Sequence, residues 1–257
     1  MQRIILIAFP FFISNIVECQ MTSSGTCVII FESKNFIWVG SDTREVTTFY
    51  NHGNSGVQKI DTVCKIRKFG DFYVSMSGTN VKPLYLAASI SCTTNKRLLQ
   101  IANDFAAIGY KLRKQYLDSI RSHDSIDYEF HFKELAGFES SFYGFEDNVA
   151  DIINVDFTII SKENEPVKLK DSIYKGHLEW ESESQLSYKV LGHSDSIIKL
   201  LNDTNWLKTK QFPNVIEELI LIEASRDTLM VAKPIDLLAI INGGKYKWLK
   251  GPAKCNY

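Results

Sequence analysis

The chain has 257 residues, of which 45% are hydrophobic and 23% are charged, and its formal net charge is −1. This composition supports a sizeable core and excludes a disordered chain. The near-neutral charge offers no general basic field, so we expect no nucleic-acid partner. Beyond the N-terminus no apolar run is long enough to cross a bilayer, so we expect no membrane span in the mature chain.

The first 20 residues have the three-part pattern of a secretory signal. Arg3 gives a positive start, residues 4–17 are almost entirely apolar, and a polar stretch follows. We predict cleavage after Cys19 or Gln20 and a secreted or periplasmic protein. Two alternatives are a buried N-terminal strand or helix, and a true start at Met21, which would make the protein cytoplasmic.

The chain shows no metal or phosphate motif, so we expect no metal and no cofactor. It has no Gly-rich phosphate loop, and its five His residues are scattered. None of its cysteines forms a C-x-x-C pair, and their spacing does not indicate whether they form disulfides. These cysteines are Cys19, Cys27, Cys64, Cys92 and Cys255. The basic run KLRKQY at 111–116 and the acidic run WESES at 180–184 are interpreted as solvated faces.

Two hairpins are predicted in the first third of the chain. Residues 26–31 and 36–43 are β-rich and flank the turn-like tetrapeptide ESKN. The runs VCKIRKFG and FYVSMSG, joined by Gly70-Asp71, form the second hairpin. Between the hairpins, residues 44–60 are polar and contain Asn, Gly and Ser, so the sequence predicts a loop there.

Helical and extended segments follow one another in blocks over the rest of the chain. Apolar residues spaced three and four apart predict a helical block over 84–121, and a weaker helix is predicted over about 128–138. NVDFTIIS and VKLKDSIYKG form a third hairpin around KENEP. Helices are predicted at about 194–203 and 213–225, where Pro213 suits a helix start. TLMVAKPIDLLAIIN is predicted to close the chain as a strand.

This order of blocks predicts an α+β fold. Helices are not interleaved one by one with strands, which disfavours a parallel βαβ sheet. Two antiparallel sheets, packed on each other and covered by helix pairs, fit the order better. We therefore expect a four-layer αββα sandwich over residues 26–257, preceded by a signal peptide over 1–20 and a short propeptide over 21–25.

The Gly25-Thr26 bond is the first candidate for chemistry. A Thr hydroxyl is a weak nucleophile at its ordinary pKa and needs a base nearby. If the chain is cut before Thr26, the new α-amine becomes that base, because its reference pKa is roughly 8. A neighbouring cation would lower the pKa of this amine further. Gly before Thr suits self-cleavage, because Gly allows the backbone geometry that a strained bond needs.

Such a nucleophile needs a Lys near the amine, a carboxylate that holds the Lys, and an amide donor for the oxyanion. Asp42 lies sixteen residues after Thr26, at the end of the second predicted strand. A hairpin with a four-residue turn brings it near the start of the first strand. Lys65 lies in the third predicted strand. Gly78 ends the fourth strand within SMSGT, where its N–H can face the reaction centre.

These segments resemble the opening of a proteasome β-subunit, a member of the N-terminal nucleophile hydrolases. The likeness is carried by GTCVIIFESKNFIWVGSDTREV and VCKIRKFGDFYVSMSGT. It is specific over residues 25–79 and extends in outline over 26–241. Between Asp42 and Lys65 this chain is longer than the family, which leaves Lys59 as a rival for the Lys role. The flanking strand pattern and the distance to Gly78 favour Lys65.

The resemblance implies a role for each of six residues. It implies Thr26 as nucleophile, Asp42 and Lys65 as its charge pair, Gly78 as oxyanion amide, Asp227 in ASRDTLMV as support for the N-terminal Thr, and Met76 near the specificity pocket. The chain departs from the family at two positions. Met230 stands where the family has a Ser, and His193 or Ser194 in LGHSD stands where the family has the Ser of a Gly-Ser-Gly turn. These departures alter the hydrogen-bond shell around the amine.

We predict a threonine-type peptidase, self-processed at Gly25-Thr26, that hydrolyses peptides or unfolded proteins through the Thr26 hydroxyl. The resemblance also implies a homo-oligomer, with stacked rings as the common assembly of the family. Two alternatives stay open: a secreted amidase of the same superfamily acting on a small amide, and an inactive subunit with a structural or binding role. Cys27 is disfavoured as an N-terminal nucleophile, because a cut after Thr26 would put Asp42 out of register.

Overall fold

The computed structural model describes most of the chain after its N-terminal segment. The described residues are 19–24, 26–51, 54–93, 95–123, 128, 137–162, 164–176, 185–192, 195–228, 230–243 and 245–251. The signal-like residues before 19, Gly25, His193 and Ser194 lie outside them. So do the acidic run at 180–184 and most of the helix predicted over 128–138, of which residues 137–138 belong to a strand.

The larger sheet has eight strands within the described residues, and all of its strand pairs are antiparallel. Its strands are β1 (Cys19–Ser24), β4 (Arg44–Asn51), β5 (Asn54–Thr62), β6 (Ile66–Phe69), β7 (Phe72–Thr79), β8 (Gly137–Glu146), β9 (Val149–Ile159) and β10 (Leu169–Lys175). Their order is β10-β9-β8-β7-β1-β4-β5, and β6 pairs with β7 beside this path. The segment that precedes Thr26 is thus a strand, between β7 and β4.

The smaller sheet has five antiparallel strands in the described part of the chain, in the order β11-β2-β3-β12-β13. They are β2 (Cys27–Ser33), β3 (Phe36–Asp42), β11 (Ser187–Gly192), β12 (Ile235–Ile241) and β13 (Lys245–Lys250). Successive side chains of a strand point to opposite faces. Accordingly Ile29 contributes to the core on the α7 side of β2, and Ile30 to the core between the sheets.

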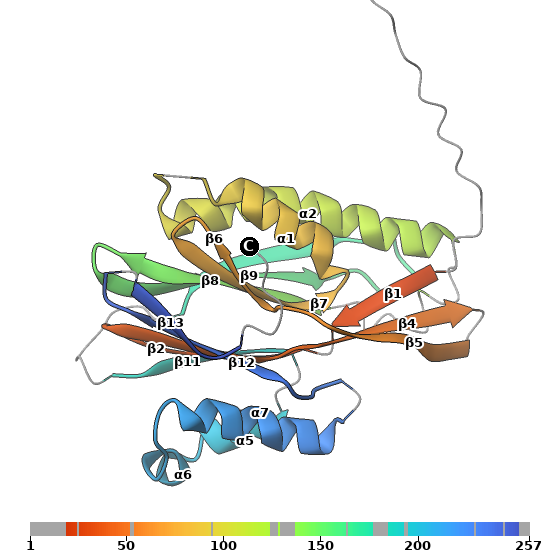
Figure 1. Ribbon diagram of the computed structural model, residues 1–257. Coiled ribbons are helices and arrows are strands. Elements are labelled where there is room, and N and C mark those ends of the chain that lie inside the picture. The colour runs from red at the N-terminus through yellow and green to blue at the C-terminus, as the bar shows by residue number, and fades with distance from the viewer. Residues whose placement is uncertain are drawn as a thin grey trace, which may run out of the picture.

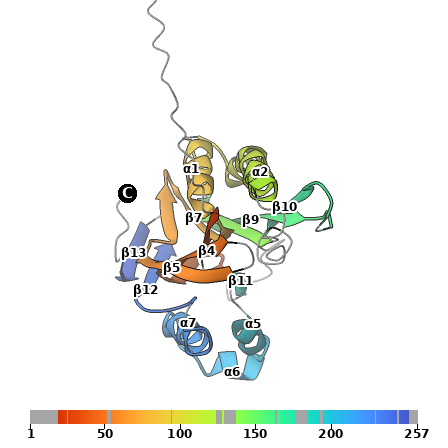
Figure 2. The same cartoon turned by 90° about the vertical axis from the view of Figure 1, so that its right-hand side faces the viewer.

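Helices cover the outer faces of the strands. The helices are α1 (Val81–Ser91), α2 (Leu98–His123), α5 (Asp195–Leu201), α6 (Thr204–Lys208) and α7 (Asn214–Arg226). In Figure 1, α1 and α2 lie over the strands β6 to β9, and α5 and α7 lie below β2, β11 and β12. Figure 2 shows the two helix groups on opposite sides of the strands. The chain is therefore an α+β protein with antiparallel sheets, consistent with a sandwich.

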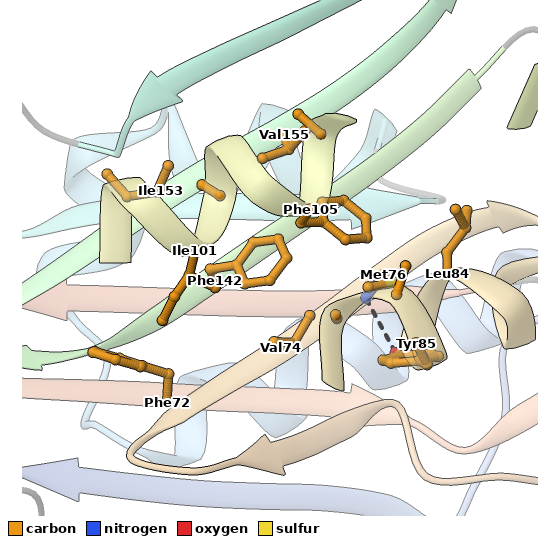
Figure 3. Close-up of a cluster of buried hydrophobic side chains, with 14 of the residues drawn as sticks. Phe72, Val74, Met76, Leu84, Tyr85, Ile101, Phe105, Phe142, Ile153 and Val155 are labelled. Carbon is orange, nitrogen blue, oxygen red and sulfur yellow. Dashed lines mark hydrogen bonds between the residues drawn. The ribbon is translucent and has the colours of Figure 1, made fainter. Parts of the chain in front are cut away.

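Among the described residues there are four apolar clusters, and three of them join the sheets and helices near the candidate site. One joins α1 and α2 to β7, β8 and β9, and Figure 3 shows Phe105 of α2 beside Phe142 of β8 in this cluster. A second lies between the two sheets and includes Val28, Ile30 and Tyr73. The third joins the smaller sheet to α5 and α7. The clusters fix the distance between the sheets, and with it the surroundings of any residue that lies between them.

The predicted hairpins are confirmed. β2 pairs with β3, β6 with β7, and β9 with β10. The helical block over 84–121 is confirmed but is divided into α1 and α2, and the predicted helices near 194–203 and 213–225 correspond to α5 and α7. The closing segment forms a strand only over Ile235–Ile241.

The predicted loop over 44–60 is wrong, because these residues form the hairpin β4–β5. The run VTTFY within it consists of β-branched and aromatic residues, which favour strands. Asn51, Asn54 and Gly56, which suggested a loop, lie within these two strands. Strands β1, β8, β11 and β13 were not predicted either.

Among the described residues, no helix combines the length and the apolar character that a bilayer crossing requires.

Gly40 of β3 provides a test of the packing between the smaller sheet and α7. A Cβ at Gly40 would lie 2.2 Å from Ile216 Cγ2, whereas a Cβ at Gly137 would meet nothing within 4 Å. We expect Gly40→Ala to lower the free energy of unfolding by about 1–3 kcal/mol, because the extra methyl forces α7 outward. Urea unfolding measures this effect.

The matched control is Gly137→Ala, which should leave the free energy of unfolding within about 0.5 kcal/mol of the wild type. Equal losses for both variants would contradict the close approach of α7 to β3.

Candidate active site

Thr26 lies between β1 and β2 and is fully buried. Its Oγ1 has no hydrogen-bond partner among the described residues. A buried hydroxyl without a partner lowers the free energy of unfolding by about 1–3 kcal/mol. A functional role would explain why the chain has a Thr at this position. Thr26 lies on the same face of β2 as Val28 and Ile30, the face that packs against the larger sheet.

Asp42 and Lys65 form a buried ion pair beside Thr26. Lys65 Nζ donates to Asp42 Oδ1 over 2.8 Å, and the side chains are 3% and 0% exposed. The N–H of Cys27, the residue after Thr26, donates to the same Oδ1 over 2.8 Å. Asp42 Oδ2 accepts the N–H of Arg44 over 3.1 Å. Asp42 therefore links the Lys65 amine to the main-chain N–H of the residue that follows the candidate nucleophile.

Burial moves the pKa of both partners toward their neutral forms. It raises the pKa of the Asp42 carboxyl, and the contact with Lys65 opposes this shift. It lowers the pKa of the Lys65 amine, and the charge of Asp42 opposes that shift. Desolvation penalises a charged group, so the Lys65 amine loses its proton more easily here than in water. Such an amine is suited to proton transfer.

Gly192 packs directly on the main chain of Thr26. It ends β11 and pairs with Cys27. A Cβ at Gly192 would lie 1.8 Å from the Thr26 carbonyl oxygen and 2.8 Å from Ser77 Oγ, and its φ is +82°. Both the positive φ and the close approach require glycine. The Gly192 N–H donates to Glu139 Oε2 over 3.1 Å, which links this strand end to the larger sheet.

Gly78 lies in β7 next to the segment that precedes Thr26. Its register partner in β1 is Ser24. Its φ is +128°, and a Cβ would lie 2.9 Å from the carbonyl oxygen of Gly137. The buried Arg113 of α2 donates through Nη1 to the carbonyl oxygen of Thr79 over 2.8 Å. Gly78 is thus held in a backbone conformation that few other residues adopt.

Arg113 also corrects the sequence interpretation of the run at 111–116 as a solvated face. The residue is 2% exposed, and its guanidinium donates to both Thr79 Oγ1, over 2.9 Å, and the Thr79 carbonyl oxygen. Burial lowers its pKa to about 10. One basic residue of this run is therefore part of the packing around β7.

Asp227 directly follows α7 and is the C-cap residue of this helix. Its Oδ1 accepts the N–H of Met230 over 3.0 Å. Arg44 Nη1 donates to the carbonyl of Thr228, and Thr43 Oγ1 donates to the carbonyl of Pro234 over 3.0 Å. The loop that follows Asp227 therefore accepts hydrogen bonds from Thr43 and Arg44, the two residues that follow Asp42.

Met76 lies in the apolar cluster beneath α1. Its side chain is 1% exposed and packs with Leu84 and Tyr85, as Figure 3 shows. Its neighbours Ser75 and Ser77 point to the opposite face of β7. Ser77 Oγ is the atom that approaches Gly192.

The described cysteines differ in state. Cys27 and Cys92 are free thiols, and Cys64, which precedes Lys65, is disulfide-bonded. Burial, followed by the charges of Asp42 and Glu223, raises the pKa of the Cys27 thiol well above its ordinary value. Its side chain belongs to the cluster on the α7 side of β2. A protonated thiol that faces away from Thr26 is a poor nucleophile.

The structure brings together Thr26, Asp42 and Lys65, with Gly78 and Asp227 on neighbouring elements. The rival Lys59 lies in β5, and its side chain is outside the described residues. The sequence analysis missed Glu139 and Ser77, and within LGHSD it considered His193 and Ser194 but not Gly192. A glycine at the end of a strand was the signal that could have identified Gly192.

No group of three or more His, Cys, Asp or Glu side chains in the described ranges is placed to hold a metal ion.

Comparison with known proteins does not assign a family. No protein-family model matches the chain, and no curated protein matches it. Among solved structures it is similar to "Thiobacillus denitrificans BPH in complex with Epoxomicin", with 13% identity and a TM-score of 0.45, over 84% of this chain and 99% of that chain. A similarity of this size leaves the functional argument to the residues of this chain.

The Asp42–Lys65 pair predicts strong coupling between two substitutions. Asp42→Asn keeps an acceptor for the Cys27 N–H but removes the charge, so Lys65 stays buried without its counter-ion. We expect the free energy of unfolding to fall by about 3 kcal/mol. Lys65→Met on the Asp42→Asn background should restore most of this loss, because no buried charge remains.

A double-mutant cycle by urea unfolding measures the coupling, which we expect to be about 2 kcal/mol. Additive effects of Asp42→Asn and Lys65→Met would contradict a direct buried ion pair.

Proposed function

We propose that this chain is a threonine-type peptidase of the N-terminal nucleophile hydrolases, similar to proteasome β-subunits, and that it processes itself at Gly25-Thr26. The observation that carries the proposal is the buried Thr26 hydroxyl beside an ion pair that is bonded to the next residue of the chain. The order of strands and helices suits the four-layer αββα sandwich of these hydrolases.

Maturation begins with the Thr26 hydroxyl. Burial lowers the pKa of Lys65 and makes its neutral amine accessible. As Oγ1 attacks the carbonyl carbon of Gly25, its proton passes to this neutral amine, directly or through a water. The C–N bond to Thr26 then breaks and the nitrogen takes a proton, which leaves residues up to 25 attached to Thr26 as an ester. Water hydrolyses this ester, releasing the upstream segment as a carboxylic acid and leaving Thr26 with a new α-amine.

Turnover repeats this chemistry on another chain. The α-amine of Thr26 accepts the hydroxyl proton as Oγ1 attacks a substrate carbonyl, and the positive charge of Lys65 lowers the pKa of this amine. The Gly78 N–H stabilises the oxyanion. The amine product leaves with a proton, and water hydrolyses the resulting acyl ester. Asp42 holds Lys65 in place throughout.

The strand β1 indicates the substrate class. The six residues Cys19–Ser24 lie extended between β7 and β4, with Ser24 opposite Gly78. Residues 21–24 of this strand belong to the propeptide, on the acyl side of the bond that maturation breaks. Once they leave, an extended peptide can pair with the same strand edges. This arrangement favours a peptide or an unfolded protein over a small amide, which would use little of the edge.

The remaining features of the proposal come from the sequence. Residues 1–20 act as a signal peptide and 21–25 as a short propeptide, so the protein works outside the cytoplasm. The mature domain over 26–257 forms a homo-oligomer, for which a ring is the family's common assembly. No metal or organic cofactor takes part in the steps above.

An inactive subunit with a binding role is the second candidate, favoured by one observation. Asp227 Oδ1 accepts the N–H of Met230, the residue that stands in place of a hydroxyl-bearing one. With one donor fewer around the amine, the supporting shell differs from that of the active family members.

Processing at Thr26 separates the two candidates. We expect the purified wild-type chain to begin at Thr26, and Thr26→Ala to keep residues upstream of position 26, because alanine has no nucleophilic oxygen. Intact mass and N-terminal sequencing measure this directly, and Thr22→Ala serves as the control that keeps the nucleophile.

If wild type and Thr26→Ala both began near Gln20 or Met21, Thr26 would never become an N-terminus. The peptidase proposal would then be abandoned in favour of the inactive subunit.

A further inference from the structure

Tyr85 of α1 is joined by hydrogen bonds to the main chain at Lys65. Its hydroxyl donates to the Lys65 carbonyl over 2.9 Å and accepts the Met76 N–H over 3.2 Å. Figure 3 shows the second of these bonds, with the Tyr85 ring beneath the α1 ribbon. The side chain is 3% exposed. A buried hydroxyl from a helix therefore lies between two strand segments.

The position of these bonds in the sheet explains what they do. The ladder between β6 and β7 begins with Ile66 opposite Ser75. Continued by one residue, it would place Lys65 opposite Met76. At this rung the Tyr85 hydroxyl bridges the Lys65 carbonyl and the Met76 N–H. At Lys65 the main chain thus separates from β7, and the Tyr85 hydroxyl fixes the distance between the two segments.

Charged groups from three elements surround this ring. The Arg67 guanidinium of β6 lies 4.0 Å from the ring centroid. Glu45 of β4 lies within electrostatic reach of both Tyr85 and Lys65, and its Oε2 lies 3.1 Å from Lys82 Nζ of α1. Burial is the largest influence on Tyr85 and raises its pKa to about 12. The hydroxyl therefore keeps its proton and remains a donor to Lys65 at any ordinary pH.

We propose that Tyr85 is a positioning residue for the reaction: its hydroxyl sets where the Lys65 main chain departs from β7, and so where Lys65 Nζ meets Asp42. The inference rests on the proposed function, since it concerns the Lys that assists Thr26. Tyr85 itself touches neither the nucleophile nor a substrate. It acts through Lys65, whose own contact with Asp42 is only 2.8 Å long.

The test is the rate of cleavage at Gly25-Thr26 as a function of pH in Tyr85→Phe, followed by intact mass. Phenylalanine keeps the ring and the burial but removes the bridge. We expect the maximal rate to fall about tenfold, because small misplacements of catalytic groups have effects of this order. The midpoint of the pH profile should move to lower pH, because a looser contact with Asp42 raises the pKa of Lys65 less.

Tyr143→Phe is the matched control. Tyr143 is also buried, and its hydroxyl lies 2.9 Å from Ser75 Oγ, so the variant loses a comparable hydrogen bond away from Lys65. We expect it to keep the wild-type midpoint and rate. Equal midpoints in wild type, Tyr143→Phe and Tyr85→Phe would overturn the inference, since a merely structural tyrosine would change only the folded fraction.

A second variant keeps the test decisive if Tyr85→Phe does not fold. Tyr85→Met also removes the hydroxyl and fills the site with a flexible apolar side chain, and we expect the rate and the midpoint to change in the same directions as in Tyr85→Phe. An unchanged profile would then overturn the inference. Failure of the wild-type chain to cleave at all would instead overturn the proposed function, so the two failures are distinct.

Discussion

The buried ion pair between Asp42 and Lys65 is the constraint on which the rest of the site depends. Removing two charges from water costs several kcal/mol per ion, and their attraction offsets this only when the geometry is good and further hydrogen bonds are made. The structure meets this condition with the N–H groups of Cys27 and Arg44, which both donate to Asp42. A buried ion pair adds little to the free energy of unfolding, but it fixes the positions of its two side chains. Here it places a lysine amine of lowered pKa next to the Thr26 main chain.

Glycines in the smaller sheet allow neighbouring segments to pack closely around Thr26 and under α7. Gly192, at the end of β11, lies against the Thr26 carbonyl, and Gly40 allows α7 to pack on β3. Both positions lack a Cβ because the opposing atoms already occupy its place. Glu139 connects the strand end at Gly192 to the larger sheet. The apolar clusters thus keep the sheets and helices in fixed positions. Within this frame, Gly192 allows β11 to approach the Thr26 main chain closely.

The sequence predicted those parts of the fold and site that depend on local pattern. The hairpins, the main helices and the approach of Asp42 to the start of β2 follow from strand propensity, turn residues and register within one hairpin. The need for a Lys held by a carboxylate followed from the chemistry of a Thr nucleophile, and the family resemblance implied that Lys65 and Asp42 form this pair. The roles of Tyr85 and Arg113 depend on contacts between segments far apart in the chain, which no local pattern encodes. Hairpin β4–β5 was missed because its Asn, Gly and Ser residues were given more weight than the strand-forming run VTTFY.

The measurement that tests the central claim most directly is the site of acylation. A peptide that carries an electrophilic carbonyl group would be reacted with the chain that begins at Thr26, and the adduct would be located by fragment mass spectrometry. The account predicts one adduct, on Thr26, and a much slower reaction in Lys65→Met. An adduct on Cys27, or equal rates with and without Lys65, would contradict the claim that the ion pair activates Thr26.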